Sequence, residues 1–253
     1  MDRRSQLTVA AIAVLVAGGA AYLYSQMQGP PAEAPKAPAA APPAPQIEHP
    51  VAPVKGEPLP SLADSDGAAA AALASLLQAP SLPDVFYPDR IVRRWVATID
   101  NLPREQVAPE VRVVRPPEGA LATRGEDASL AIAPDNSARY AHYMSLLAAA
   151  DVGQTAALYR RFYPLFQSAY EELGYPGKYF NDRLIAVIDH LLATPDVAEP
   201  IRLVHPSVMY KFADPKLESL SAGQKALLRL GRENTQQVKA KLRALRAEIV
   251  GVH

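Results

Sequence analysis

The chain is 253 residues long, with 26 basic and 26 acidic side chains, 25 prolines and no cysteine. Zero net charge argues against a dedicated nucleic-acid-binding protein, which normally carries a basic excess. Without cysteine, the chain can form no disulfide, thiolate zinc site, iron–sulfur cluster or thiol nucleophile.

The N-terminus predicts a membrane anchor. Residues 7–24 form an apolar run without a charged side chain, at the short end of the length that spans a membrane as a helix. Two arginines precede the run, so the positive-inside rule leaves residues 1–6 in the cytoplasm and the rest of the chain outside it. The alternative is a cleaved signal peptide ending at the small residues 18–21. The apolar run continues through Tyr22 and Tyr24, which favours the uncleaved anchor.

Residues 25–60 predict a disordered, Pro/Ala-rich linker. Between residues 29 and 60, 11 residues are proline and 8 are alanine, and large apolar side chains are nearly absent. Such a stretch cannot bury enough apolar surface to offset the entropy lost on folding. In the polyproline conformation its reach would be on the order of 100 Å. We interpret it as a spacer between membrane and domain, rather than as a ligand for a proline-recognition module.

Residues 61–253 predict a mainly α fold, a single compact helical domain with a small β-hairpin excursion. The length suffices for one hydrophobic core. Apolar periodicity, caps and breakers predict helices over residues 64–78, 89–100, 137–150, 151–173, 182–193 and 221–250. Asn136 and Asp151 are the expected N-caps of the third and fourth helices, and Pro164 is expected to kink or restart the fourth.

Two short β-prone runs, 111–114 and 130–133, predict the hairpin, because prolines and glycines separate them. An isolated hairpin is marginally stable, so we expect it to pack on the helices. Four prolines confine residues 195–215 to loop or extended structure, with at most an edge strand at 208–212.

The last predicted helix begins at a capping box formed by Ser221 and Gln224 and continues through Gly231. Its apolar residues recur at intervals of three and four. Its other faces carry seven basic residues against two glutamates. We interpret it as a domain helix with a solvated basic face; the alternative is a projecting helix that forms a homodimer or contacts anionic phosphates.

Eight peptides of unusual sequence stand out in the domain. They are Leu59–Leu62, Asp100–Arg104, Tyr163–Gln167, Glu172–Pro176, Tyr179–Arg183, Val187–Leu192, Tyr210–Pro215 and Leu220–Lys225. Together they resemble a bacterial family known as domain of unknown function 3014. The resemblance spans roughly residues 59–250. It implies a proteobacterial, membrane-anchored protein of unknown activity, with no catalytic residues to carry over.

A polar and aromatic cluster is the candidate binding site. Seven of the eleven tyrosines lie between residues 140 and 179, with arginine and aspartate beside several of them. Tyrosine and arginine dominate binding hot spots. The candidate binding residues are Arg139, Tyr140, Tyr179, Asn181, Asp182, Arg183 and Asp214. The alternative is that the tyrosines fill half-buried seams between helices, while Asp182 caps a helix and pairs with an arginine.

Catalytic and metal-binding patterns are absent from the sequence. The five histidines lie at positions 49, 142, 190, 205 and 253, without metal-ligand spacing, and there is no nucleophile elbow or phosphate loop. We therefore expect no metal and no cofactor. A glycosidase would need two carboxylates about 5 Å or 6.5–9.5 Å apart. The available ones are Glu171, Glu172, Asp182, Asp189, Asp214 and Glu218.

The sequence thus predicts a membrane-tethered periplasmic binding or scaffolding module of the bacterial cell envelope, single-pass in the inner membrane, and favours this over an enzyme without deciding the question. The expected partner is another envelope protein or a cell-wall component, not nucleic acid. The alternative is a cell-wall glycan-acting enzyme that uses paired carboxylates. A third hypothesis, carriage of a small ligand, would require an enclosed apolar pocket.

Overall fold

The computed structural model describes residues 47–52, 54, 56–78, 84–206 and 209–251. The predicted anchor at 7–24 and the greater part of the predicted linker lie outside the described residues. Within these ranges, no helix combines the length and the apolarity needed to cross a membrane.

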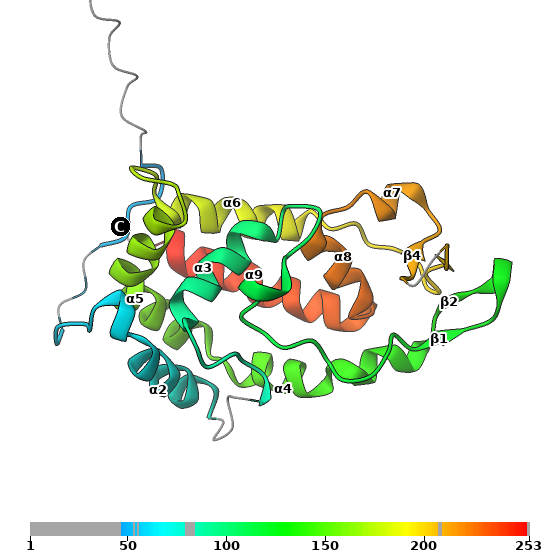
Figure 1. The fold of residues 1–253 in the computed structure, drawn as a ribbon, viewed down its shortest axis with the longest axis horizontal. Coiled ribbons are helices and arrows are strands. Elements are labelled where there is room, and N and C mark those ends of the chain that lie inside the picture. Colours follow the sequence, from blue (N-terminus) through cyan, green and yellow to red (C-terminus); the bar gives the residue numbers. More distant parts are fainter. Residues whose placement is uncertain (1–46, 53, 55, 79–83, 207–208, 252–253) are drawn as a thin grey trace, which may run out of the picture. The chain divides into compact units, whose positions relative to one another are not determined.

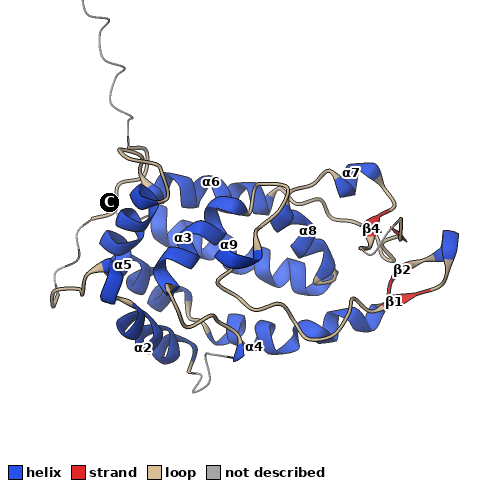
Figure 2. Ribbon diagram, viewed as in Figure 1, coloured by secondary structure: helices blue, strands red, loops and turns tan. Residues whose placement is uncertain are grey.

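The structure is mainly helical, as predicted (Figures 1 and 2). Its α-helices are α2 (Asp66–Leu77), α3 (Ile91–Asn101), α4 (Ala141–Ala149), α5 (Val152–Glu172), α6 (Phe180–Leu192), α7 (Pro215–Glu218), α8 (Ala222–Arg229) and α9 (Arg232–Val250). Short 3-10 helices cover Leu62–Asp64, Pro109–Val111, Asp127–Ser129 and Pro134–Tyr140. All described residues belong to one compact unit.

The centre of the domain is built on α5, which packs against α3 and α9, while α6 also packs against α9 (Figure 1). The main core cluster contains aromatic residues of α5 together with Phe180 at the start of α6. Phe166 and Phe180 stack with ring centroids 5.9 Å apart, and Tyr170 stacks on Tyr175 at 4.6 Å. Such pairs contribute beyond the area that they bury. The aromatic content of this region is therefore largely structural.

Pro164 lies inside α5 without dividing it, so of the two predicted outcomes, a kink or a restart, the restart is wrong. Proline removes one helical hydrogen bond and crowds the preceding turn. Phe162, Tyr163 and Leu165 are nevertheless all buried on the core face. Burial of this face outweighs the local cost, because tertiary packing supplies most of a helix's stability. The predicted cap at the start of α5 is confirmed: Asp151 Oδ1 accepts a hydrogen bond from Gln154 N over 2.8 Å.

The predicted continuous helix over 221–250 is wrong, because Gly231 separates α8 from α9. Its φ of +86° lies in the left-handed region that favours glycine. A Cβ at this position would also come within 3.3 Å of Ser137 Cβ. The break allows α9 to turn onto α5 and α6. The capping box of Ser221 and Gln224 at the start of α8 is confirmed.

The hairpin prediction is half right. Strand β1 (Thr123–Arg124) pairs antiparallel with β2 (Ala131–Ile132), with Thr123 opposite Ile132. The second predicted run is therefore a strand, but its partner is β1 and not residues 111–114. That first run instead makes a single antiparallel bridge, Val114 opposite Phe86, and is also held by α3, where Val113 N donates to Thr98 Oγ1 over 3.0 Å. The run therefore pairs with residues 85–87, a partner that its local sequence did not indicate.

A second pair, β3 (Leu203–Val204) with β4 (Lys211–Phe212), is also antiparallel and contains the predicted edge strand. The two pairs are joined, because Leu203 N donates to the Leu130 carbonyl and Ile132 N donates to the Ile201 carbonyl. Both lie at one end of the domain, beside α8 (Figure 2).

Asn136 does not cap a helix as predicted. The 3-10 helix Pro134–Tyr140 surrounds it, and its side chain is buried. Its Oδ1 accepts from Ala122 N over 3.1 Å, and its Nδ2 donates to the Arg229 carbonyl over 2.8 Å. The residue joins three segments distant in sequence, because a buried amide needs partners for both of its polar atoms.

Candidate functional site

The seven predicted site residues do not converge on one place. Tyr179, Asn181 and Asp182 gather at the start of α6, where Arg183 faces a separate network. Arg139 and Tyr140 lie in the segment before α4, and Asp214 lies before α7.

The start of α6 binds a strap of four residues, 48–51, which lies beside it (blue in Figure 1). Asp182 accepts hydrogen bonds from His49 N over 2.7 Å and from Glu48 N over 3.2 Å. Its Oδ1 also lies 3.2 Å from His49 Nδ1, in an ion pair when the ring is protonated. The carboxylate thus holds both backbone and side chain of the strap.

Two neighbours of Asp182 complete this attachment. Asn181 is fully buried; its Nδ2 donates to the His49 carbonyl over 2.9 Å, and its Oδ1 accepts from Tyr159 Oη over 2.8 Å. Tyr179 Oη accepts from Val51 N over 2.7 Å. These three predicted site residues therefore form hydrogen bonds with the main chain of the protein's own strap.

The linker prediction is corrected at its C-terminal end. Val51 and Leu59 pack against the main core cluster, and the Arg161 guanidinium donates to the Glu57 carbonyl. The prediction failed because composition alone marked these residues as linker, whereas their partners lie more than a hundred positions away in the chain.

Replacing Asp182 with asparagine should loosen the first half of the strap, where Asn181 still holds the His49 carbonyl, and leave the second half unchanged. We expect faster hydrogen exchange at the Glu48 and His49 amides, because an amide side chain is a weaker acceptor than a carboxylate. Tyr179→Phe is the matched variant, since of the strap's three amides it removes the acceptor of Val51 N alone. Residue-resolved exchange by NMR checks both. Equal acceleration at all three amides in both variants would contradict separate attachments.

Arg183 forms an ion pair with the buried carboxylate of Asp100. The side chain of Asp100 is 2 % exposed, and its Oδ1 accepts from Arg183 Nε over 2.8 Å. Arg183 Nη2 also donates to the Asp100 carbonyl over 2.7 Å. Arg104 Nη2 and Tyr175 Oη donate to Asp100 Oδ2 over 2.8 and 3.2 Å. The network joins α3, α6 and the loop after α5.

The other predicted residues also make structural contacts. The Arg139 guanidinium donates to the Glu118 and Gly119 carbonyls over 3.1 and 2.7 Å, and lies 5.8 Å from the ring centre of Tyr140. Asp214 is the N-cap of α7, accepting from Lys216 N over 2.8 Å. Neither position contributes to the strap or to the Asp100 network.

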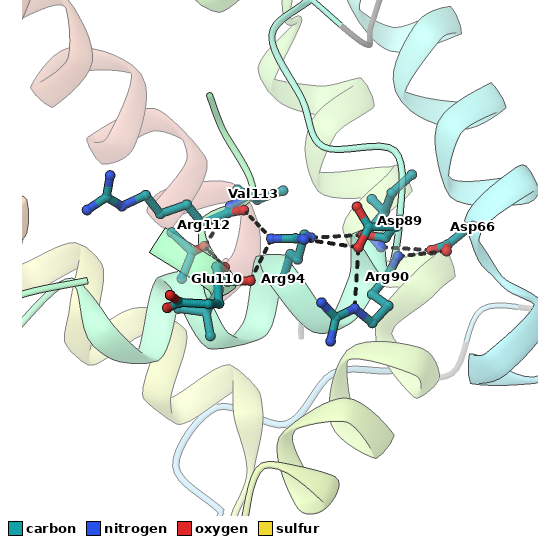
Figure 3. Close-up of polar contacts among 10 residues, drawn as sticks. Asp66, Asp89, Arg90, Arg94, Glu110, Arg112 and Val113 are labelled. Carbon is teal, nitrogen blue, oxygen red and sulfur yellow. Dashed lines mark hydrogen bonds and ion pairs between the residues drawn. The ribbon is translucent and has the colours of Figure 1, made fainter. Parts of the chain in front are cut away.

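Figure 3 shows a further polar cluster, centred on Arg94 of α3, that the sequence analysis missed. This buried guanidinium donates to three carbonyls, those of Asp89, Glu110 and Arg112, over 3.0, 2.6 and 3.0 Å. It also pairs with the Asp89 carboxylate at 3.0 Å and lies 4.7 Å from the Tyr87 ring centre. The only signal in the sequence was two adjacent arginines in α3, Arg93 and Arg94, with a third, Arg90, directly before the helix.

Two tyrosine hydroxyls lie in the aromatic core. Burial raises the pKa of Tyr159 and that of Tyr163 far above the ordinary value, and nearby Tyr179 raises both pKa values further. Tyr163 Oη donates to Gln167 Oε1 over 3.0 Å. The same oxygen accepts from Phe180 N over 2.9 Å, which fixes the start of α6.

Strongly alkaline pH should therefore unfold the domain. An unfolded tyrosine loses its proton near pH ~10 while these folded ones keep theirs, so stability present below that pH is lost as the pH rises further. Urea unfolding at about pH 8 and about pH 11 measures the loss. The Tyr163→Phe variant should lose less free energy of unfolding between these two pH values, because one of the two buried hydroxyls is gone. Gln167 keeps its bond from Phe180 N, so the start of α6 stays in place. An equal loss in both proteins would contradict this origin.

An open groove lies where β2, the 3-10 helix before α4, and the junction of α8 and α9 meet. Its larger cavity measures about 270 Å³ and is lined by Arg124, by residues of the three elements just named, and by Glu199–Ile201. A second cavity of about 210 Å³ adjoins it and continues along α9 to Lys239 and Arg243. We call the two together the α9 groove.

The floor of the α9 groove is apolar and its rim is charged. Ile201 and Leu228 are buried beneath it. Glu199 Oε1 accepts from Arg232 N over 3.0 Å, and Arg232 Nη2 pairs with Asp196 at 2.8 Å. None of the seven predicted binding residues lines either cavity. The groove was not predictable from local sequence, because its walls come from three separate segments.

The described residues contain no group of three or more histidine, aspartate or glutamate side chains that could hold a metal ion. The carboxylates considered for glycan hydrolysis are also engaged: Asp189 with Arg246 at 2.6 Å, Glu172 with Arg93 at 2.8 Å, and Glu218 with Phe212 N at 2.9 Å. These three make separate contacts, and none of the six carboxylates lines either cavity.

The basic helix α9 is an integral part of the domain. Its apolar residues Leu242, Leu245 and Ile249 pack against α6 in one cluster. Several cations are bound as well: Lys241 Nζ donates to the Ala150 carbonyl over 2.6 Å, and Arg246 holds Asp189. The stripe that would pair in a homodimer is therefore covered within the chain.

Comparison with known proteins gives one result. A family model described as "Protein of unknown function (DUF3014)" matches residues 91–246, from the start of α3 into the last turns of α9. No curated protein and no solved structure matches the chain. The matched range contains the Asp100 network, the start of α6 and the residues lining the α9 groove. Since the match covers more than half of the chain, the protein belongs to the DUF3014 family.

Proposed function

We propose that this protein is a membrane-tethered periplasmic binding or scaffolding module of the bacterial cell envelope, and that the α9 groove is where it binds. The groove carries the proposal: it joins two cavities of about 270 and 210 Å³ over an apolar floor, with charged side chains at its rim. Binding sites typically combine apolar walls with a few placed polar groups.

The strap supports the tethered part of this proposal. Three side chains at the start of α6 hold the segment that connects the domain to the Pro/Ala-rich stretch. An attachment built from hydrogen bonds to the main chain fixes where the chain leaves the domain. A fixed exit point of the chain suits a domain that is held at a distance from the apolar run at 7–24.

Site-specific photo-crosslinking in intact cells tests the proposal. A photoreactive residue replaces Gln236, which lines the second cavity; the control replaces Ala186, an exposed residue of α6. We expect a reproducible crosslinked envelope component from position 236 and none from 186. The same pattern of products from both positions, or none from 236, would overturn it.

An enzyme acting on cell-wall glycan is the second candidate, on one observation. Glu199 and Glu233 both line the larger cavity, whereas the carboxylates considered from the sequence do not. Glu199 already accepts a hydrogen bond from Arg232 N. Release of reducing ends from purified wall material, abolished in Glu199→Gln and in Glu233→Gln, would favour the enzyme over the binding module.

A further inference from the structure

We propose that the larger cavity of the α9 groove binds a short peptide with a free carboxylate and a free ammonium group, the carboxylate at Arg124 and the ammonium at Glu233. This inference rests on the function proposed above, since it names the ligand class of the same groove. It goes further by assigning each charged end to one side chain.

Two rim charges carry the assignment. Within the described residues, the side chains of Arg124 on β1 and Glu233 on α9 make no hydrogen bond or ion pair, although both line the cavity and are exposed. The other two charges of the lining are engaged: Arg232 with Asp196, and Glu199 with the Arg232 amide. The cavity therefore offers one available cation and one available anion, from two different elements, β1 and α9.

The interior between these charges suits small aliphatic groups. Ile201 and Leu228 are 6 % and 5 % exposed, and Ile132 and Pro200 complete the apolar lining. A volume of about 270 Å³ is small for a ligand site. A peptide of two or three small residues is of this size.

The walls of the cavity are fixed before any ligand arrives. Asn136 ties the 3-10 helix to the Arg229 carbonyl over 2.8 Å, and Asn234 Nδ2 donates to the Leu230 carbonyl over 3.0 Å. Gly231 is held at positive φ against Ser137. Preorganised walls lower the entropic cost of binding, so a small ligand can bind measurably.

The same lining disfavours other ligand classes. Two arginines and two glutamates balance, so a polyanion would meet as much repulsion as attraction. Among the described residues around this cavity, none is aromatic, which leaves a sugar ring no flat apolar face to lie on. A zwitterionic peptide satisfies both the charges and the floor.

Titration of the protein with trialanine, followed by NMR shifts of backbone amides, tests the proposal. We expect saturable binding with a Kd on the order of 1 mM, and shifts that centre on residues around the cavity. N-acetyl-trialanine and trialanine amide, each lacking one charge, should bind about tenfold more weakly.

Substitutions assign the ends. Arg124→Gln should bind trialanine and its amide equally, while still discriminating against the acetylated peptide; Glu233→Gln should show the reverse. Arg243→Gln, in the adjoining cavity, and Glu105→Gln, an exposed residue elsewhere, are matched controls that should change neither preference. All four sites are exposed, and circular dichroism confirms that each variant is folded.

Absence of saturable binding, shifts centred away from the groove, or end preferences that survive both substitutions would overturn the proposal. So would equal weakening by Arg124→Gln and Arg243→Gln, which would indicate a general effect of charge. If trialanine fails while position 236 still captures a partner in cells, the peptide assignment falls and the binding function stands. If neither succeeds, both fall.

Discussion

Replacing Asp100 with alanine should lower the free energy of unfolding by about 3–5 kcal/mol, the usual cost of breaking a buried ion pair from one side. The carboxylate is 2 % exposed and receives hydrogen bonds from Arg183, Arg104 and Tyr175. Without it, Arg183 keeps one bond, to the Asp100 carbonyl, and part of its charge stays buried without a counterion. Urea unfolding measures the loss.

Arg104→Ala is the matched control for this prediction. It removes a partner of the same carboxylate, but its own side chain is 55 % exposed, so we expect a cost below about 1 kcal/mol. The double variant Asp100→Leu with Arg183→Met should recover part of the loss, because two apolar side chains leave no buried charge unpaired. If Arg104→Ala costs as much as Asp100→Ala, burial of the carboxylate is not the cause.

Replacing Arg94 with methionine should cost about 3 kcal/mol, because it keeps the aliphatic length but removes every donor. The carbonyls of Asp89, Glu110 and Arg112 would lose their shared partner (Figure 3). Arg94→Lys should recover only part of the loss, since an ammonium group cannot reach carbonyls on two sides as a planar guanidinium does.

The control here is Arg90→Met. Arg90 contacts the same Asp89 carboxylate at 3.4 Å, but its side chain is 62 % exposed, so we expect a change within about 0.5 kcal/mol. A cost for Arg90→Met comparable to that of Arg94→Met would show that charge near Asp89, and not the bound carbonyls, is what matters.

The stability of the protein at low pH tests the Arg94 cluster independently. The hydrogen bond from Arg94 holds the pKa of Asp89 below its ordinary value. A carboxylate with a lowered folded-state pKa stabilises the fold above its unfolded pKa, and this contribution is lost as the pH falls below about 4. The Arg94→Met variant should therefore lose less of its remaining stability on acidification than the unmodified protein.

Local patterns predicted the helices because the apolar residues of a helix face recur three and four positions apart, a spacing that is visible in the sequence. The periodicity of residues 151–173 gave α5, and the caps at Asp151 and Ser221 were placed correctly. The resemblance of short peptides also identified the family, which the match over residues 91–246 confirms.

The same local patterns could not show where polar side chains are used. Asp182 looked like part of a binding site, yet it holds the strap, 133 positions away in sequence at His49. Arg183 looked like its companion, yet it serves Asp100, 83 positions away. A hydrogen-bond partner at such a distance leaves no periodic signal, so residue type alone cannot distinguish a ligand contact from an internal one.

The sequence by itself determined an apolar N-terminal run, a Pro/Ala-rich stretch, a helical domain and its family. The tertiary structure alone decided that α8 and α9 separate at Gly231, that the strap belongs to the domain, and that a groove opens between β2 and α9. The physical reason is the range of the interactions. Helix propensity, periodicity and caps act over one or two turns, whereas a break, an attachment or a cavity depends on segments brought together only by folding.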